Sequence, residues 1–412
     1  MAVIFSEEQK VFILETKNLS YMIKTDHLGH LEHLYFGPKT GAEDLSASFP
    51  HREHAFSGTP YEISSDHAYS LDFIPQEYTS YGIGDYRVNS IAISHADGSC
   101  CADFKYVSHS VTDGKYDLEG LPCVYDEDGS SKTLIIRLND PVSNVNIELY
   151  YAVLEDLDVI TRSAKIINEG QSAVVLHKAS SICLDLPYGK WDLIHFHGRH
   201  CMENQVERIP LFHGIQTISS VRGMSSHQHN PFVIISEHDA TEDHGICYGC
   251  MLMYSGNHKT EIELDQLDSV RVVTGIHDDF FDWQLLPGES FVTPEVILSC
   301  ADGLTQLSHN YHKTIRHHVV RGRYKLSHRP ILVNSWEAAY FDVNKEKLLA
   351  LADKAREIGA ELFVLDDGWF KNRNDDYAAL GDWTEDPYKF PDGLDGLITE
   401  IENRGLLFEI GR

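Results

Sequence analysis

Short apolar runs alternate with turn residues through the first three quarters of the chain, a pattern typical of β-strands. In Thr133–Arg137 and Val145–Tyr151 apolar residues recur at alternate positions or nearly continuously, as expected for strands with one or both faces buried. Asp97–Gly98 and Asp113–Gly114 favour tight turns between such runs. No helical period of useful length interrupts them. Residues 1–312 are therefore predicted to form a large antiparallel β-sandwich. Further runs of this kind are Val11–Leu14, Tyr69–Phe73, Val159–Ile166, Phe232–Ile235 and Ser269–Val273.

From residue 330 onward the pattern changes to an alternation of strands and helices. Ile331–Val333 and Leu362–Leu365 are apolar runs of strand length, and Leu406–Phe408 begins a third. Asn344 is a suitable N-cap for the first helix between them, and glycines stand where both helices should stop. This order predicts the opening of a parallel α/β fold. The apolar helix faces comprise Leu348, Leu351, Ala352, Ala355 and Ile358, stopped by Gly359, and Leu394, Leu397, Ile398 and Ile401, stopped by Gly405.

Charge separates the two parts and excludes some partners. Residues 313–329 carry six Lys or Arg and no acid, but the whole chain has 63 Asp and Glu against 34 Lys and Arg, a net charge of −29. Such an acidic surface repels nucleic acid and anionic lipid, so the basic segment is interpreted as a linker. Three parts are predicted: a sandwich (1–312), a linker (313–329) and an α/β part (330–412). No apolar run is long enough to span a membrane.

Cysteine and histidine usage indicates neither a disulfide framework nor a metal site. Eight cysteines are scattered over 412 residues, and Cys247–Cys250 is a single C-x-x-C followed by strand-like sequence. His195 with His197 and His227 with His229 are spaced to place two imidazoles on one strand face, but no third ligand stands at a recognisable spacing. We therefore expect no metal. The N-terminus lacks signal-peptide features, so a cytoplasmic location is predicted.

Candidate chemistry lies where the predicted parallel strands end, the place where such folds hold ligand groups. Asn334 to Ala338 follows the first strand, and Asp366 and Asp367 follow the second. Adjacent carboxylates there need hydroxyl or cation partners, and the nearby Trp336 and Trp369 offer flat faces for a sugar ring. The alternative is that one aspartate caps a turn and the other is solvated.

At these residues the sequence resembles the α-galactosidases of glycoside hydrolase family 36. The resemblance extends from about residue 10 to 408, nearly the whole chain. The similar segments in the second part are Arg329–Ala338, Glu361–Phe370 and Leu380–Trp383. Those in the first part are Tyr81–Arg87, Leu118–Pro122, Arg222–Phe232, Pro287–Glu289 and Thr293–Glu295.

The resemblance implies an N-terminal β-sandwich followed by a (β/α)8 barrel and a small C-terminal β domain, assembled in many bacterial members as homotetramers. It further implies retaining hydrolysis of terminal α-galactosides such as melibiose and raffinose, small neutral substrates, without a cofactor. Asp366 and Asp367 match the pair that holds the galactose hydroxyls, and Trp336 matches an aromatic residue near the active site. In the family pattern, the nucleophile and the acid/base are expected at positions beyond Arg412. Lys190–Asp192 resembles the nucleophile segment only in part and lies within the predicted sandwich.

The end of the chain departs from the family pattern after Phe408, where Glu409–Arg412 replaces the expected continuation. About 80 residues after the linker are too few for a barrel of about 250. The chain is therefore expected to be truncated inside an incomplete (β/α)8 barrel, and to be inactive or nearly so by itself. One alternative is a non-catalytic sugar-binding or assembly module built on the sandwich. The other is an α-N-acetylgalactosaminidase or galactosyltransferase of the same family.

Overall fold

The computed structural model describes residues 2–48, 59–60, 63 and 66–411. The chain divides into two compact units, Met1–Arg321 (unit 1) and Gly322–Arg412 (unit 2), and each is described by itself. The division falls within the segment predicted as a linker.

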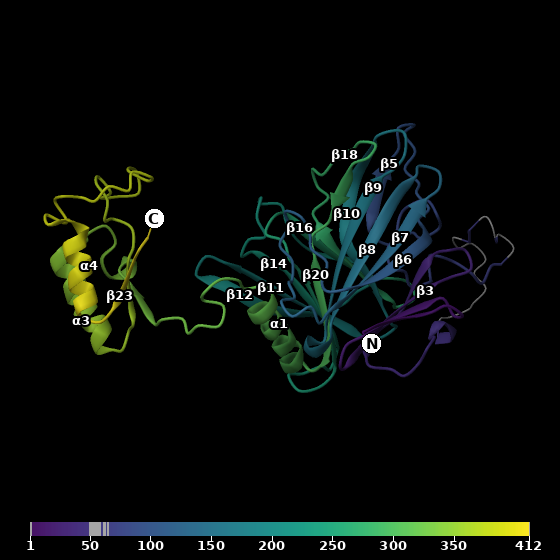
Figure 1. The fold of residues 1–412 in the computed structure, drawn as a ribbon, viewed down its shortest axis with the longest axis horizontal. Coiled ribbons are helices and arrows are strands. Elements are labelled where there is room, and N and C mark those ends of the chain that lie inside the picture. Colours follow the sequence, from purple (N-terminus) through teal and green to yellow (C-terminus); the bar gives the residue numbers. More distant parts are fainter. Residues whose placement is uncertain (1, 49–58, 61–62, 64–65, 412) are drawn as a thin grey trace. The chain divides into compact units, whose positions relative to one another are not determined.

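The described strands of unit 1 form three antiparallel sheets (Figure 1). The smallest pairs consecutive strands: β1 (Val3–Ser6), β2 (Val11–Glu15), β3 (Leu19–Thr25) and β4 (Leu31–Pro38). A six-stranded sheet, ordered β13-β16-β17-β10-β18 with β5 also on β10, contains β5 (Ile91–Ser94), β10 (Val174–Leu186), β13 (Gly214–Ser220), β16 (His258–Leu264), β17 (Val270–Ile276) and β18 (Trp283–Leu285).

The third sheet is ten-stranded, in the order β12-β11-β14-β15-β20-β9-β8-β7-β6, with β19 also on β9. Short 3-10 turns, η1 (Ser46–Ser48) and η3 (Glu155–Leu157), lie between strands. The strands of this sheet are β6 (Lys105–Asp113), β7 (Lys132–Asp140), β8 (Val145–Leu154), β9 (Val159–Asn168), β11 (Trp191–Arg199), β12 (Met202–Pro210), β14 (His229–Glu237), β15 (Ile246–Leu252), β19 (Ser290–Val292) and β20 (Val296–Asp302).

The two larger sheets share one hydrophobic core, which confirms the predicted antiparallel β-sandwich. Ile182 and Val272 of the six-stranded sheet belong to the same buried cluster as Leu149 and Leu298 of the ten-stranded sheet. Side chains alternate across each strand, so every second residue enters this shared layer. The four-stranded sheet adds Tyr21 to the same core.

One helix of unit 1 was not predicted. Helix α1 (Leu304–His318) begins in the region predicted to be entirely β and ends inside the predicted linker. Its buried face alternates apolar Leu307 and Tyr311 with polar Asn310 and Thr314, which hides the helical period from the sequence. The polar pair is satisfied: Asn310 donates to Ser299 Oγ at 3.1 Å, and Thr314 donates to the Asn310 carbonyl at 2.8 Å.

The prediction of a strand at Tyr69–Phe73 was also wrong, because this segment forms turns. The backbone N–H groups of Phe73 and Ile74 both donate to the carbonyl of Ser70 at 3.1 Å, and the Ser70 hydroxyl accepts from Asp72 N at 3.2 Å. Local hydrogen bonds of this kind compete with strand pairing. The other predicted strands are confirmed.

Unit 2 has the strand–helix order that the sequence predicts. Three parallel strands lie in the order β21-β22-β23, and Leu362 of the central strand pairs with Leu332 and Leu407. Asn344 caps α3 by accepting from Lys347 N at 3.0 Å, as predicted. Ile358, placed on the buried face of that helix, is instead 78% exposed because the helix has already ended. The elements are β21 (Leu332–Asn334), α2 (Trp336–Ala339), α3 (Lys345–Glu357), β22 (Leu362–Leu365), α4 (Gly393–Asn403) and β23 (Leu407–Ile410).

Within the described residues, no helix has the length and apolarity needed to cross a bilayer. All eight cysteines are free thiols. Cys247 and Cys250 are buried in β15, the strand setting that the sequence predicted for the C-x-x-C segment. Burial raises the pKa of the Cys247 thiol to about 11 and that of Cys250 to about 12, so both stay protonated near neutral pH.

Candidate functional site

The ends of β21 and β22 bring Asn334 and Asp366 into contact. The Asn334 side-chain amide donates to Asp366 Oδ2 at 2.5 Å, and the backbone of Asp366 donates to Ser335 Oγ at 3.0 Å. Parallel strands end at the same edge of a sheet, so residues 32 positions apart in the chain meet here. Asp366 is only partly buried.

Asp367, the neighbouring aspartate, has a different environment. Arg373 donates from Nε to Oδ1 at 2.9 Å and from Nη2 to Oδ2 at 2.7 Å, a forked ion pair. Gly368 N also donates to Oδ1 at 2.7 Å, and Arg373 Nε lies 3.0 Å from Oδ2. The hydrogen bonds from Arg373 hold the pKa of Asp367 below its usual value. Three N–H groups therefore donate to this carboxylate, and the single hydrogen of Arg373 Nε is shared between its two oxygens.

Trp336 is joined to the aspartates through Asn334. Its backbone N–H donates to Asn334 Oδ1 at 2.7 Å. The indole ring packs edge-on against Tyr340 and Phe341, with centroids 5.1 and 5.0 Å away. The ring is half-buried, so the sequence-predicted aromatic residue lies at the strand end with part of its surface accessible.

A second aromatic group follows β22 and fixes the loop after the aspartates. Trp369 stacks on Trp383, with centroids 6.3 Å apart and an angle of 19° between the rings. The indole N–H of Trp369 donates to the Gly411 carbonyl at 2.9 Å, which ties this loop to the end of β23. Trp369 is buried, so it supports the site and does not offer a free face to a sugar.

Sequence reasoning missed two cations that organise this strand end. Arg373 holds Asp367, and the ammonium group of Lys389 donates to the carbonyls of Gly368, Phe341 and Arg373 at 2.7, 3.0 and 3.0 Å. Both cations lie in irregular loops, where no periodicity marks a buried residue. Of the residues that organise this strand end around the aspartates, only Asn334 could be found from the sequence, because it is a polar residue directly at a predicted strand end.

Lys190–Asp192, the segment that partly resembles the nucleophile motif, lies at the start of β11 in unit 1. Asp192 is buried and accepts from Arg208 Nε at 2.6 Å, with His238 Nδ1 2.8 Å from its other oxygen. Both oxygens of its carboxylate thus have partners within the sandwich, and Asp192 is not available as a nucleophile.

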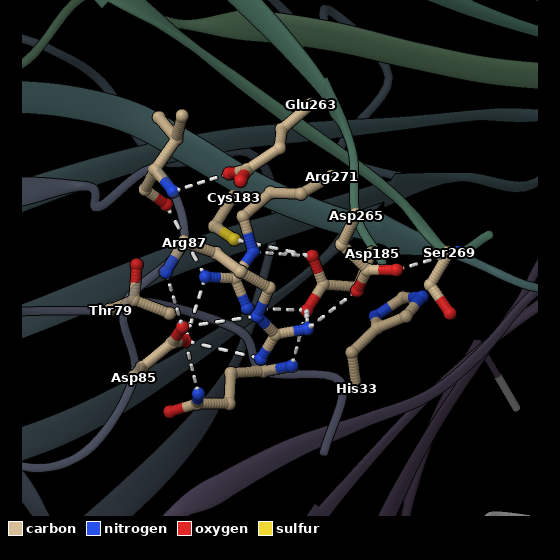
Figure 2. Close-up of polar contacts among 12 residues, drawn as sticks. His33, Thr79, Asp85, Arg87, Cys183, Asp185, Glu263, Asp265, Ser269 and Arg271 are labelled. Atoms are coloured by element: carbon tan, nitrogen blue, oxygen red, sulfur yellow. Dashed lines mark hydrogen bonds and ion pairs between the residues drawn. The ribbon is translucent and has the colours of Figure 1, made fainter. Parts of the chain in front are cut away.

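Unit 1 contains a second group of charged residues, shown in Figure 2. Arg271 of β17 donates from Nε and Nη2 to the two oxygens of Asp185 at 2.7 Å each, and from Nη1 to Asp85 at 2.7 Å. Arg87 donates from Nε to Asp85 at 3.0 Å and from Nη2 to the Leu71 carbonyl at 2.8 Å. We call Asp85, Arg87, Asp185 and Arg271 the buried clamp.

The buried clamp is a structural device and leaves no group for a ligand. Its four side chains are at most 5% exposed. Gln76 N donates to Asp185 at 2.8 Å, so the clamp also holds the irregular segment before β5 against β10 and β17. Burial acts to raise the pKa of Asp185, but the charge and hydrogen bonds of Arg271 outweigh it, and the pKa is lowered. Two of the clamp residues, Asp85 and Arg87, belong to a segment on which the family resemblance rests.

Comparison with known families confirms that resemblance. The model described as the glycosyl hydrolase family 36 N-terminal domain matches residues 29–286, and the model described as melibiase matches residues 290–411. The first of these alone covers more than half of the chain.

Similar proteins include the bifunctional alpha-galactosidase/sucrose kinase AgaSK of Mediterraneibacter gnavus, 44% identical over 100% of this chain and 44% of that protein. Alpha-galactosidase Mel36A of Lactobacillus acidophilus is 41% identical over 98% of this chain and 55% of its own length. A crystal structure of a variant of AgaA, a family 36 alpha-galactosidase from Geobacillus stearothermophilus, in complex with raffinose superposes with a TM-score of 0.92 at 41% identity, covering 97% of this chain and 56% of that one. The chain thus spans about half the length of the relatives it matches.

Proposed function

The chain belongs to glycosyl hydrolase family 36, and we propose that it serves the hydrolysis of terminal α-galactosides such as raffinose. Within that reaction the end of the parallel sheet in unit 2 holds the galactose ring. The names of the similar proteins support the activity, and the raffinose complex of the AgaA variant supports the substrate class.

The environment of Asp366 is the observation that carries the proposal. Among the described residues, its Oδ2 accepts from Asn334 and its Oδ1 accepts from Asp367 N at 2.7 Å, which leaves one acceptor position on each oxygen. Two adjacent hydroxyls of a sugar can donate to these positions. Trp336 at the neighbouring strand end supplies an apolar surface beside them.

Asp367 acts mainly through Arg373. Its carboxylate accepts from the guanidinium fork and from Gly368 N, which leaves fewer acceptor positions for a sugar hydroxyl than Asp366 has. We assign Asp366 to direct contact with galactose and Asp367 to fixing the loop that presents it. Retaining hydrolysis also needs a nucleophile and an acid/base about 5–5.5 Å apart. Neither role is assigned to a residue of this chain.

Two further properties are proposed with the function. All eight cysteines are free thiols, which supports a cytoplasmic location. Assembly of the whole protein into a homotetramer rests on the family resemblance.

The proposal is tested in two steps with one substitution. In calorimetric titration, the 412-residue chain should bind galactose, and it should bind glucose, which differs in the configuration of one hydroxyl, more weakly. It should hydrolyse a nitrophenyl α-galactoside only near the detection limit. A chimera in which residues 1–408 are followed by the remaining barrel of AgaA should hydrolyse that substrate, and Asp366→Asn should raise its KM. An inactive but folded chimera, or unchanged kinetics in Asp366→Asn, would contradict the proposal.

A further inference from the structure

Three neighbouring strands of the six-stranded sheet bring a serine, a histidine and an aspartate together in unit 1. Strand β10 lies between β5 and β18 (Figure 1), and its residue Val175 pairs with Ser94 on one side and with Gln284 on the other. His177 of β10 is thus flanked by Ser94, the last residue of β5, and by Asp282, which directly precedes β18. We call Ser94, His177 and Asp282 the Ser–His–Asp group.

The hydrogen bonds of the Ser–His–Asp group all run in one direction. Nδ1 of His177 lies 2.6 Å from Oδ1 of Asp282, and Nε2 of the same ring lies 2.6 Å from Oγ of Ser94. A carboxylate only accepts, so in the neutral imidazole Nδ1 donates to Asp282 and Nε2 accepts from the Ser94 hydroxyl. In this tautomer a histidine can take the proton of a serine. The arrangement is that of a catalytic triad, which is recognised by geometry and roles and not by chain order.

An irregularity in β10 positions the histidine of this group. A regular continuation of the ladder with β5 would place His177 opposite Ala92, but Lys178 occupies that place. In the described part of this ladder His177 is therefore the extra residue of a β-bulge. Bulges of this kind turn a side chain in a new direction and are common beside active sites. Here the bulged residue reaches Ser94 with one ring nitrogen and Asp282 with the other.

The Ser–His–Asp group lies at the surface, where a substrate can reach it. Ser94 is partly buried, and the side chains of His177 and Asp282 are 44% and 75% exposed. The net charge of the chain is −29, which repels anionic substrates but not neutral ones. The exposed thiol of Cys100 lies 3.7 Å from Ser94 Oγ and is a second nucleophile that a test has to separate from the serine.

We propose that Ser94, activated by His177 and positioned through it by Asp282, accepts acyl groups from small neutral carboxylic esters. Oγ of Ser94 bonds to the carbonyl carbon while Nε2 of His177 takes the hydroxyl proton. The C–O bond of the ester then breaks, and that proton leaves with the alcohol. Water attacks the acylated serine and gives a proton to Nε2, which returns it to Oγ as the carboxylic acid departs. Ester and water thus become acid and alcohol, independently of the galactoside chemistry proposed for unit 2.

The openness of the group determines which substrates we expect to react. Because Asp282 is largely exposed, water screens its attraction to the imidazolium ion that forms during acylation. Only esters with good leaving groups, such as nitrophenyl acetate, should therefore react at a measurable rate. The alternative is that the two hydrogen bonds only hold the three strands together, in which case Ser94 would be no more reactive than any other exposed serine.

The test labels the 412-residue chain with diisopropyl fluorophosphate and locates the label by mass spectrometry of its peptides. Oγ of an activated serine bonds to phosphorus, fluoride leaves, and the histidine takes the hydroxyl proton. The matched control is Ser99 in the loop after β5, whose hydroxyl donates directly to Asp97 at 2.7 Å. We expect Ser94 to be labelled at least about tenfold faster than Ser99, and His177→Gln to slow the labelling of Ser94 at least about tenfold. Ser94→Ala should also abolish hydrolysis of nitrophenyl acetate above that of Ser99→Ala.

Variants of the positioning residue distinguish catalysis from a structural role. Asp282→Asn should slow the labelling of Ser94 without changing Tm, because an amide can donate to Nδ1 and leave the proton on Nε2. Asp282→Glu keeps a carboxylate and should restore part of the rate. Both substitutions are at an exposed side chain, so both variants should fold even if Ser94→Ala does not, and circular dichroism verifies this.

Four results would overturn the proposal: no label on Ser94 in the folded chain, equal labelling of Ser94 and Ser99, an unchanged rate in His177→Gln, or loss of ester hydrolysis in Cys100→Ala. The last result would assign the reactivity to the thiol. Selective labelling of Ser94 that depends on His177 and on the carboxylate of Asp282, and that persists in Cys100→Ala, supports the proposed acyl transfer.

Discussion

In unit 1 the carboxylates of Asp85 and Asp185 are enclosed by guanidinium groups, whereas in unit 2 the carboxylate of Asp366 has one side-chain partner, a neutral amide. Arg271 alone makes three hydrogen bonds of 2.7 Å within the buried clamp. Asp366 receives one side-chain hydrogen bond, from Asn334, and is partly exposed. Both groups consist of residues that sequence reasoning would consider for catalysis or binding.

The difference teaches that saturation and burial, more than residue type, separate structural charges from ligand-binding ones. A buried ion pair with every acceptor filled contributes little net stability over an apolar substitute, yet removing one partner is strongly destabilising. A half-exposed carboxylate with spare acceptor positions is stable without a ligand and gains hydrogen bonds when one arrives. Substitutions should therefore change folding in unit 1 and binding in unit 2.

The largest expected effect comes from opening the buried clamp. Arg271→Met keeps a long side chain but leaves Asp185 buried without its main cation and Asp85 with Arg87 as its remaining cation. We expect the free energy of unfolding of unit 1 to fall by about 3–5 kcal/mol, measured by urea denaturation at pH 7. The control is Arg199→Met at the exposed end of β11, which should change stability by less than about 0.5 kcal/mol. Equal losses of stability in the two variants would contradict the view that a buried, fully paired charge is structural whereas an exposed one is not.

Glu32 offers a second way to examine buried charge, because burial and the nearby charge of Asp26 raise its pKa to about 7. An acid whose folded pKa lies above its unfolded value stabilises the fold below about pH 4.5, and this contribution is lost as the pH rises toward 7. Glu32→Gln removes the ionisation, so the variant should become more stable than the parent as the pH rises from 5 to 8. The expected gain at pH 8 is on the order of 2–3 kcal/mol.

Urea denaturation at pH 5 and pH 8 measures that difference, with Glu8→Gln as the control. Glu8 is exposed and undergoes the same chemical change, so its stability curve should run parallel to that of the parent. If Glu32→Gln and Glu8→Gln responded alike to pH, the ionisation of Glu32 would not be coupled to folding.

In unit 2 the two adjacent aspartates should separate binding from stability. Asp366→Asn removes the acceptor with spare positions and should weaken galactose binding about tenfold, with little change in Tm, because a hydrogen bond to a charged group is involved. Asp367→Asn disrupts the fork with Arg373 and should lower Tm more than Asp366→Asn does. Calorimetric titration with galactose and thermal unfolding of both variants provide the comparison. The reverse pattern would exchange the roles assigned to the two residues.

Sequence periodicity predicted the antiparallel strand character of unit 1, the three strands and helices α3 and α4 of unit 2, and the strand ends where Asp366 and Asp367 lie. It could not predict α1, whose buried face contains Asn310 and Thr314 and so lacks a continuous apolar stripe. These residues are buried because Ser299 and the helix backbone satisfy them, a fact that depends on tertiary packing.

Pairings between distant residues were equally inaccessible. Asp85 and Arg271 lie 186 positions apart, and no local pattern relates them. One signal was present: Arg271 interrupts an otherwise apolar run in β17, and a charge in a buried strand requires a buried partner. The same reasoning applies to His195, which continues an apolar strand face. Its charged neighbour Glu207, whose Oε2 lies 3.4 Å from His195 Nε2, belongs to the adjacent strand, so spacing in the sequence could not reveal this pair.

The smallest expected effect is a loss of stability in unit 2, and it tests whether a polar side chain there can be structural without contributing to binding. Asn344 accepts a hydrogen bond from Lys347 N at the start of α3, and its loss leaves a helix N–H without a partner. Asn344→Ala should lower the free energy of unfolding of unit 2 by about 1 kcal/mol without changing galactose affinity. Asn374→Ala, an exposed asparagine in a loop of the same unit, is the control and should change neither. Weakened galactose binding in Asn344→Ala would mean that the start of α3 and the strand end that holds Asp366 are coupled. Stability and binding would then not be separable in unit 2, even though the carboxylate of Asp366 is partly exposed.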